Sequence, residues 1–179
     1  MRVFQIGVLP GLAQGVLEMT ESATHSINIR SPRFLVARTV APCWRCSAPT
    51  TLIAVALPPG HETLELDDEA SGEAHAVDTW QTAAQHAFLF HIEFLPNFVA
   101  AQLQPLASLR YDGYWANHCA WCDLPQDDQA LFCEPEGAFA PASESSAALI
   151  EILAIDEPFE AAVAGYAVEP QFLYAMRRK

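Results

Sequence analysis

Positive charge is scarce in this chain. Nine lysine and arginine residues stand against 22 aspartate and glutamate residues, which gives a net charge of −13. Between residues 47 and 176 the only base is Arg110. Because binding to a phosphate backbone depends on lysine and arginine, this shortage argues against nucleic acid as a partner. The acidic charge would instead attract a basic protein partner by complementarity, or it would simply keep the protein soluble.

Charged residues of both signs are also few. They make up 17% of the chain, whereas 51% is hydrophobic. Soluble domains usually carry about 25% charged residues, so an unusual share of this surface must be neutral or apolar. We therefore expect a face that is covered by a partner protein or by a second copy of the chain. The length and composition suffice for a single domain with a buried core.

Long apolar runs are missing as well. No stretch of about 18 residues is apolar without interruption, which predicts no membrane-spanning helix. Residues 1–17 are interrupted by Pro10 and three glycines and lead to no clear cleavage site. We therefore expect no secretory signal and a cytoplasmic location, where a disulfide framework is disfavoured.

Common catalytic motifs are absent. The chain contains no G-x-S-x-G elbow, no P-loop and no dinucleotide-binding glycine fingerprint. The best catalytic candidates are His86, His91, Glu93 and Asp112, which would have to converge for a metal-assisted hydrolase. The alternation in FLFHIEF explains His91 and Glu93 more simply, as the polar face of a strand. We lean towards a non-enzymatic protein and keep the hydrolase near His91 as an alternative.

Four of the five cysteines form two C-x-x-C pairs. Cys43 and Cys46 make the first, Cys119 and Cys122 the second, and residues 47–118 lie between them. Zn²⁺ binds four ligands tetrahedrally, and two C-x-x-C turns supply four thiolates. The pattern predicts one closed, structural Zn²⁺ site that holds the fold together. Thiol–disulfide chemistry, an iron site or a cluster without metal are the alternatives.

Residues near these pairs have expected roles too. His118 could replace a cysteine ligand, although the four-cysteine set is favoured. Cys133 is expected to be a small buried hydrophobic residue. Trp44 and Trp121 occupy each pair's interior and are expected to shield the sulfurs from water.

The apolar runs RFLVARTVA (33–41) and TTLIAVAL (50–57) predict a β-hairpin with the first cysteine pair at its tip. We predict an α+β fold, in which antiparallel hairpins form a four-cysteine zinc ribbon accompanied by a few helices. Further strands are expected over 88–94, 109–117 and 130–133, and helices over 79–87, 157–164 and from 97 to 103 or 107. Residues 147–155 fit either a capped helix or a buried strand, and 172–176 a last strand or a docked tail.

The predicted domain covers residues 33–176. Residues 1–32 are expected to form an N-terminal arm, and 177–179 a basic tail that frays. Residues 61–79 are rich in acids and are expected to form a loop. Within that loop, the residues expected to bind a basic partner are Glu65, Asp67, Asp68 and Glu69.

The second cysteine pair lies in NHCAWCDLPQDDQALFCEPEGAF. This stretch, with CWRC and its flanking strands, resembles a zinc-ribbon group of uncharacterised bacterial proteins with N-x-C-x-x-C-G followed by E-P-x-G-x-F. The resemblance covers residues 34–57 and 88–141 and implies a zinc ribbon and a cytoplasmic setting, but no activity. Its matching positions are Asn117, Cys119, Cys122, Asp127 or Asp128, Leu131, Phe132, Glu134, Pro135, Gly137 and Phe139. Ser47 and Asp123 depart from it, because glycine commonly follows a cysteine pair in a left-handed conformation.

Together these patterns favour a zinc-stabilised, acidic protein-interaction module. Its most concrete form is an immunity or inhibitor protein that covers a basic surface. A zinc-ribbon nucleic-acid or transcription accessory module is the alternative, and it would use Arg33, Arg38 and Arg45.

Overall fold

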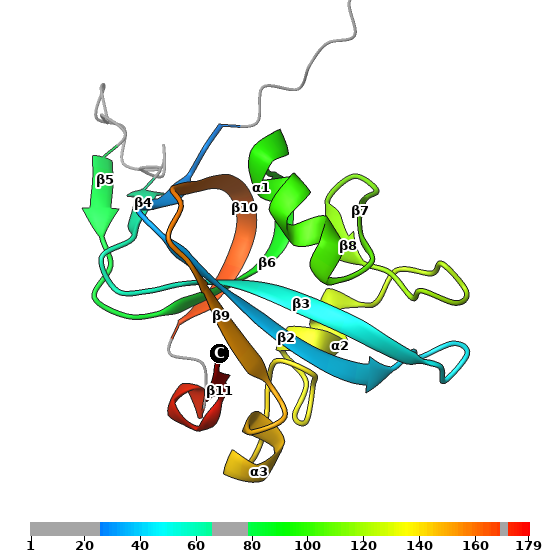
Figure 1. The fold of residues 1–179 in the computed structure, drawn as a ribbon. Helices are drawn as coiled ribbons and strands as arrows, with labels where there is room; N and C mark the ends of the chain where they lie inside the picture. Colours follow the sequence, from blue (N-terminus) through cyan, green and yellow to red (C-terminus); the bar gives the residue numbers. More distant parts are fainter. Residues whose placement is uncertain (1–25, 66–78, 169–171) are drawn as a thin grey trace, which may run out of the picture.

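A computed structural model describes residues 26–65, 79–168 and 172–179. Their eleven strands belong to one sheet, with short helices at its margins (Figure 1). This confirms the predicted fold class, although β structure dominates. The strands are β1 (Ile29–Ser31), β2 (Phe34–Pro42), β3 (Pro49–Leu57), β4 (Glu62–Glu65), β5 (Thr79–Thr82), β6 (Ala87–Phe94), β7 (Leu109–Tyr111), β8 (Trp115–Asn117), β9 (Glu151–Ile155), β10 (Phe159–Val168) and β11 (Arg177–Arg178). The helices are α1 (Asn97–Leu103), α2 (Asp128–Phe132), α3 (Glu144–Ala147) and the 3₁₀ turns η2 (Gln104–Leu106) and η3 (Leu173–Ala175).

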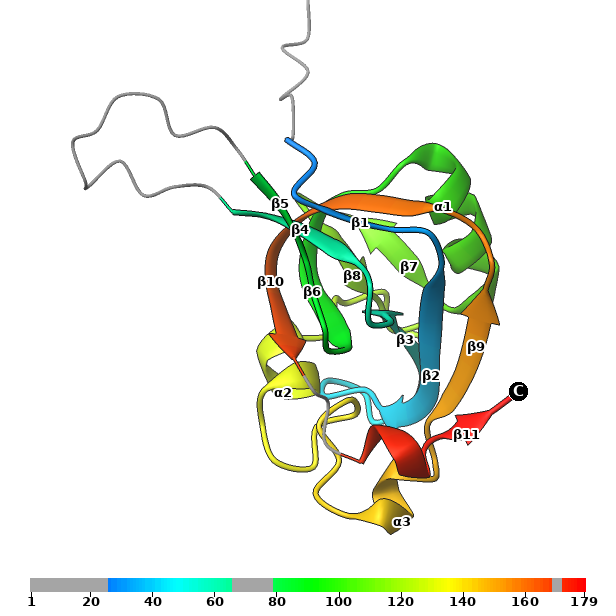
Figure 2. The same cartoon turned by 90° about the vertical axis from the view of Figure 1, so that its left-hand side faces the viewer.

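The strand order is β11-β9-β2-β3-β6-β10-β1-β4-β5, and β8 adds the β7–β8 hairpin to β6. All of these pairings are antiparallel except that of β11 with β9. Strand β10 pairs with β1 at its beginning and with β6 along the rest of its length. The sheet curls around its interior at this strand, as Figure 2 shows.

A bulge lies where β10 changes partner. The register shifts between Ala162 and Val163. The side chain of Asn28 accepts a hydrogen bond from the Val163 N–H at 3.0 Å and donates one to its carbonyl at 2.8 Å. A bulge leaves backbone groups without ladder partners, and this asparagine satisfies two of them.

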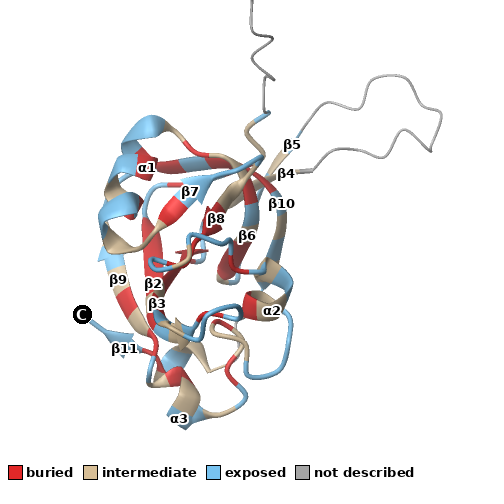
Figure 3. Cartoon of the chain, turned by 90° about the vertical axis from the view of Figure 1, so that its right-hand side faces the viewer, coloured by how far each residue is buried: buried red, intermediate tan, exposed pale blue. Residues whose placement is uncertain are grey.

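The β2–β3 hairpin is buried on both faces. Alternate residues of a strand point to opposite sides, so Phe34 and Val36 enter one core cluster while Leu35 and Ala37 enter another. Strand β3 divides in the same way. Burial on both sides explains why the two strands read as continuous apolar runs, and Figure 3 shows the buried bands along them.

Helix α1 closes the first cluster. It begins at Asn97, after Pro96, and buries Val99, Ala100 and Leu103. The predicted helix is therefore confirmed at this position. Proline is tolerated before the first turn because the amide there has no partner within the helix.

Two predicted helices are wrong. Residues 79–82 form β5, which pairs with β4, and β6 begins at Ala87. Residues 159–168 form β10, in which Phe159, Ala161 and Val163 are buried. The alanine-rich sequence favours a helix locally, but cross-strand pairing with β6 and β1 stabilises the strand. Gly165 lies within β10 opposite Phe90, whose ring occupies the space that a Cβ would need.

The strand expected over 130–133 is also wrong, because α2 covers Asp128–Phe132. Asp127 caps it by accepting the Gln129 N–H at 3.0 Å, a role that aspartate commonly fills. In the following turn, a Cβ on Gly137 would lie 2.4 Å from the Ala130 carbonyl oxygen. Only glycine fits there, so the E-P-x-G-x-F segment has a packing role.

Of the two alternatives over 147–155, the strand is found from Glu151 onward, whereas helix α3 reaches only Ala147. Ser143 caps α3 through a reciprocal pair of hydrogen bonds with Ser146. Strand β9 follows at Glu151 and pairs with β2. The capped turn therefore precedes this stretch, and the strand in it is only partly buried, with Ile152 as its buried residue.

The chain ends and the acidic segment differ from the expectations. Of the predicted arm, residues 1–25 lie outside the described residues, while β1 joins the sheet. The tail 177–179 does not fray, since the Lys179 N–H donates to the Ile152 carbonyl at 3.1 Å. The predicted loop 61–79 begins with strand β4 and ends at the first residue of β5, and its residues 66–78 lie outside the described residues. Every helix in the described ranges is too short or too polar to cross a membrane.

Candidate metal centre

The first cysteine pair forms the tip of the β2–β3 hairpin, as predicted. The Cys43 N–H donates to the Ala48 carbonyl and the Ser47 N–H to the Cys43 carbonyl, both at 2.9 Å. The Arg45 N–H points at the Cys43 sulfur, 3.4 Å away. Ser47 has a φ of 59°, the left-handed conformation expected after a C-x-x-C turn.

The second pair repeats this geometry after β8. The Cys119 N–H donates to the Leu124 carbonyl at 2.9 Å and the Asp123 N–H to the Cys119 carbonyl at 3.0 Å. The Trp121 N–H lies 3.4 Å from the Cys119 sulfur, and Asp123 has a φ of 60°. Two separate segments thus form the same turn, and each aims two sulfurs outward from it.

The structure brings the four cysteines together. All four sulfurs lie within 4.8 Å of one another. The Sγ atoms of Cys43 and Cys122 are 3.7 Å apart, and those of Cys46 and Cys119 are 3.6 Å apart. Four sulfurs bonded to one Zn²⁺ at about 2.3 Å in a tetrahedron lie about 3.8 Å apart. The cluster can therefore hold a metal ion such as zinc, and it is the one group of this kind in the described ranges.

Each pair is followed, four residues after its second cysteine, by a buried polar side chain that reaches across to the other pair. The Thr50 hydroxyl donates to the Cys119 sulfur at 3.4 Å. The Gln126 amide donates to the Cys43 sulfur at 3.6 Å. Both residues are buried. Donors of this kind stabilise negative charge on sulfur and orient the ligands.

The thiols of this cluster differ in acidity. Hydrogen bonds from the Thr50 hydroxyl and the Cys122 N–H lower the pKa of Cys119 to about 6. A hydrogen bond from the Cys46 N–H lowers the pKa of Cys43. For Cys122, the Leu124 N–H acts to lower the pKa, but burial and the neighbouring thiols raise it to about 12. The four sulfurs lie close enough to affect one another's protonation. A shared cation suits them, because it binds all four as thiolates.

Replacement of Thr50 by valine tests the hydroxyl contact. Thr50 lowers the pKa of Cys119, so its loss raises that pKa and lets protons compete better with the metal. We expect Thr50→Val to bind zinc about ten-fold more weakly and to release it at a higher pH than the wild type. Titration with a zinc-binding dye from pH 8 to pH 4 measures both. Thr50→Ser keeps the hydroxyl and should behave like the wild type; equal release curves for all three proteins would contradict the assigned role.

Asn117 anchors the second pair to the sheet. Its side-chain carbonyl accepts the Ile53 N–H and its amide donates to the Ile53 carbonyl, each at 2.9 Å. Asn117 is buried, two residues before Cys119. Strand β6 pairs with β3 only over Val55–Leu57, so the asparagine takes the place of a neighbouring strand at Ile53 and fixes the second pair beside the first.

The two tryptophans do not shield the sulfurs as expected. Trp44 is 64% exposed and Trp121 is 76% exposed. The Trp44 indole N–H donates to the Pro125 carbonyl at 3.0 Å, which links the two turns. Cys43 and Cys119 are instead buried by the turns themselves. Both indoles, one in each turn, therefore present their rings to solvent.

The other predicted residues lie elsewhere. His118 is buried, with Nδ1 3.1 Å from the Ala116 carbonyl oxygen, and does not belong to the cluster. Cys133 is exposed, contrary to its expected burial, because it follows the last turn of α2. Of the partner-binding candidates Glu65, Asp67, Asp68 and Glu69, the first ends β4, and the other three lie outside the described residues.

The hydrolase candidates form no metal cluster within the described ranges. His91 has a φ of 51° and stacks on Tyr114, with ring centroids 4.2 Å apart. The backbone N–H of His91 donates to the Asp128 carboxylate at 3.0 Å, and burial raises the pKa of Asp128. Tyr114 and Asp128 were not predicted to lie here, since no spacing pattern joins them to His91. Burial lowers the pKa of His86.

The arginines of the nucleic-acid alternative do not form one patch. Arg33 precedes β2 and Arg45 follows it, so nine strand residues, about 30 Å, separate them. Arg38 is paired with Glu151. A continuous basic surface of the kind that phosphates require is not formed by these three side chains.

Comparison of the chain with protein-family models, curated proteins and solved structures gave no match. The fold and the cysteine cluster are thus what characterise the protein, and the resemblance in the sequence remains a prediction.

Proposed function

We propose that this protein is a zinc-stabilised interaction module that binds a basic protein partner through the tip formed by the two cysteine turns. The observation that carries the proposal is the exposure of Trp44 and Trp121, one in each of the two cysteine turns. Exposed tryptophans on a rigid support are typical of residues that dominate binding energy at interfaces. We also propose that the tip is a zinc ribbon of the group that the sequence resembles.

The metal's part in this proposal is structural. Four thiolates fill the tetrahedral shell of Zn²⁺ and leave no position for water or substrate. The turns are short and carry few apolar residues, so the ion would supply the rigidity that packing does not. A fixed tip loses little conformational freedom on binding, which favours affinity.

The charge of the surroundings favours a cationic partner. The exposed acids Asp123 and Asp127 follow the second cysteine pair, and Asp123 is paired with Arg110 at 2.7 Å, in a chain whose net charge is −13. Arginine and lysine side chains bind to the faces of tryptophan rings, and nearby carboxylates strengthen such contacts. An immunity or inhibitor protein that covers a basic surface, in the cytoplasm, is the concrete form of the proposal. A gene for a toxin-like protein beside this coding sequence would support it.

Affinity capture with the zinc-loaded protein tests this function. We expect basic proteins to be retained, released as salt rises, and lost when Trp44 and Trp121 are both replaced by alanine. The double variant should still bind zinc, and its melting temperature should fall only slightly, because both rings are exposed and the one bond lost is the exposed hydrogen bond from Trp44 to Pro125. Tyr174→Ala, at another exposed aromatic residue, is the matched control. If the retained proteins are unchanged by the double replacement, the tip is not the binding surface.

A further inference from the structure

The sheet also carries a groove beside η2, the turn that follows α1. This groove of about 560 Å³ opens over β2, β3, β9 and β11. It is lined by Arg38, Val40, Thr51, Leu149, Glu151 and Arg177, among others. The strand register brings these side chains together. Arg38 on β2 lies opposite Glu151 on β9, and Glu151 lies opposite Arg177 on β11. The volume is within the range of small-molecule sites.

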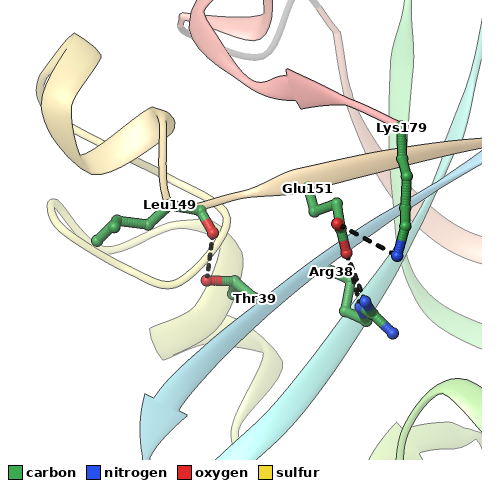
Figure 4. A network of polar contacts seen from close by, with 5 residues as sticks. All are labelled: Arg38, Thr39, Leu149, Glu151 and Lys179. Atoms are coloured by element: carbon green, nitrogen blue, oxygen red, sulfur yellow. Dashed lines mark hydrogen bonds and ion pairs between the residues drawn. The ribbon is translucent and has the colours of Figure 1, made fainter.

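Positive charge gathers at one end of this groove. Arg38 donates to the Glu151 carboxylate from Nε at 3.1 Å and from Nη2 at 2.5 Å, and the Lys179 ammonium is 3.6 Å from the same carboxylate. Figure 4 shows both cations reaching Glu151. The hydrogen bond from Arg38 lowers the pKa of Glu151, with further help from the charges of Lys179 and Arg177. Three cationic side chains thus surround one carboxylate.

This arrangement leaves cationic donors free. Arg38 uses one edge of its guanidinium for Glu151. Arg177 is exposed and makes no ion pair with any residue in the described ranges. Arg38 already neutralises the Glu151 carboxylate, so Arg177 adds a further positive charge beside it. Such a local excess of positive charge is unusual in a chain with nine bases. Arginine is the side chain best suited to carboxylates, which it binds through two parallel hydrogen bonds.

The other end of the groove is apolar. Val40 is 63% exposed and Leu149 is 68% exposed, and the partly buried Leu106 lines the groove beside them. Val40 follows Arg38 by two residues on the same face of β2, a separation of about 7 Å. A ligand that fits both ends has an anionic head and a short apolar body.

From this juxtaposition we propose that the groove between β2, β9 and β11 binds a small organic acid. Its carboxylate would accept hydrogen bonds from Arg177 and the free edge of Arg38, with Lys179 beside them. Its apolar chain would lie against Val40 and Leu149. None of the residues that line the groove belongs to the two cysteine turns, and the site does not depend on the proposed partner.

Titration of the zinc-loaded, ¹⁵N-labelled protein with hexanoate tests the site by NMR. We expect saturable shifts at the amides of β2, β9 and β11, weaker shifts with acetate, which lacks the apolar chain, and none with hexylammonium, which lacks the anion. Equal shifts with hexanoate and hexylammonium, or an affinity for acetate equal to that for hexanoate, would overturn the proposal.

Two variants separate the ends of the groove. Arg177→Gln should weaken hexanoate about ten-fold, as expected for one charged hydrogen-bonding partner, whereas Arg33→Gln, at an exposed arginine before β2, should leave it unchanged. Val40→Ser should reduce the preference for hexanoate over acetate. Both altered side chains are exposed, so folding should be retained, which melting curves check. Wild-type affinity in Arg177→Gln would refute the assignment of the carboxylate site.

Discussion

Replacement of Cys43 by serine is expected to abolish tight zinc binding and to lower the melting temperature by about 10 °C. Removal of one thiolate opens a tetrahedral site whose four sulfurs lie within 4.8 Å of one another. Structural zinc contributes directly to folding free energy. A loss of about 4 kcal/mol corresponds to roughly this shift in a domain of this size. Elemental analysis and thermal unfolding, monitored by circular dichroism, measure both quantities.

Cys133→Ser is the matched control for this prediction. Cys133 is exposed and lies outside the cluster, so its replacement should leave one zinc ion per chain and the wild-type melting temperature. If the purified wild-type protein contained iron, or no metal, the zinc assignment would be wrong. If Cys43→Ser kept zinc at full stoichiometry, the four-cysteine site would be wrong even though the sulfurs converge.

The effect of metal removal should be uneven along the chain. The two core clusters include sixteen and twelve buried residues of the sheet and its covering helices, and none of them is a cysteine. These cores can persist without metal. The turns have few apolar contacts of their own, so hydrogen exchange should speed up first at residues 43–48 and 119–126 in chelated protein.

The sequence was informative where the signal is local. A C-x-x-C pair fixes a turn by itself, and the flanking runs 33–41 and 50–57 have the length and composition of strands. The hairpin, its tip and the convergence of the cysteines followed from these patterns. The left-handed conformation at Ser47 and Asp123 was equally predictable, because the turn geometry requires it whatever residue is present.

Elsewhere the decisive interactions are distant in sequence. Residues 159–168 have the composition of a helix, yet they form β10 because β1 and β6 supply hydrogen-bond partners on either side. The same reason applies to β5, which pairs with β4. The acidic stretch between these two strands in the sequence gives no sign of their pairing. Periodicity within a short segment does not report such partners.

The surroundings of the cysteine cluster were predicted less well than the cluster itself. The expectation that Trp44 and Trp121 cover the sulfurs assumed that aromatic rings seek burial, but the turns already bury Cys43 and Cys119. The crossed donors Thr50 and Gln126 have a signal that could have been used. Each follows its pair by four residues, and a matched polar position after two equivalent turns indicates a shared role.

Replacement of Asn117 by alanine is expected to be as damaging as loss of a ligand, although Asn117 does not touch the cluster. It removes two hydrogen bonds and leaves the N–H and the carbonyl of Ile53 buried without partners. Each unsatisfied group costs about 1–3 kcal/mol, so we expect a loss of about 4 kcal/mol and a fall of about 10 °C in melting temperature. Because the anchor fixes Cys119 beside the first turn, zinc affinity should fall more than ten-fold as well.

Asn117→Asp separates the anchor from simple loss of packing. The aspartate keeps the shape and an acceptor for the Ile53 N–H, but it places a carboxylate oxygen against the Ile53 carbonyl. We therefore expect it to be strongly destabilised at pH 7 and partly restored as pH falls, when the protonated carboxyl can donate. Asn117→Ala should show no such recovery. Unfolding in urea across pH 4–7 measures the difference, and parallel pH profiles would mean that the side chain acts by filling space rather than by pairing with β3.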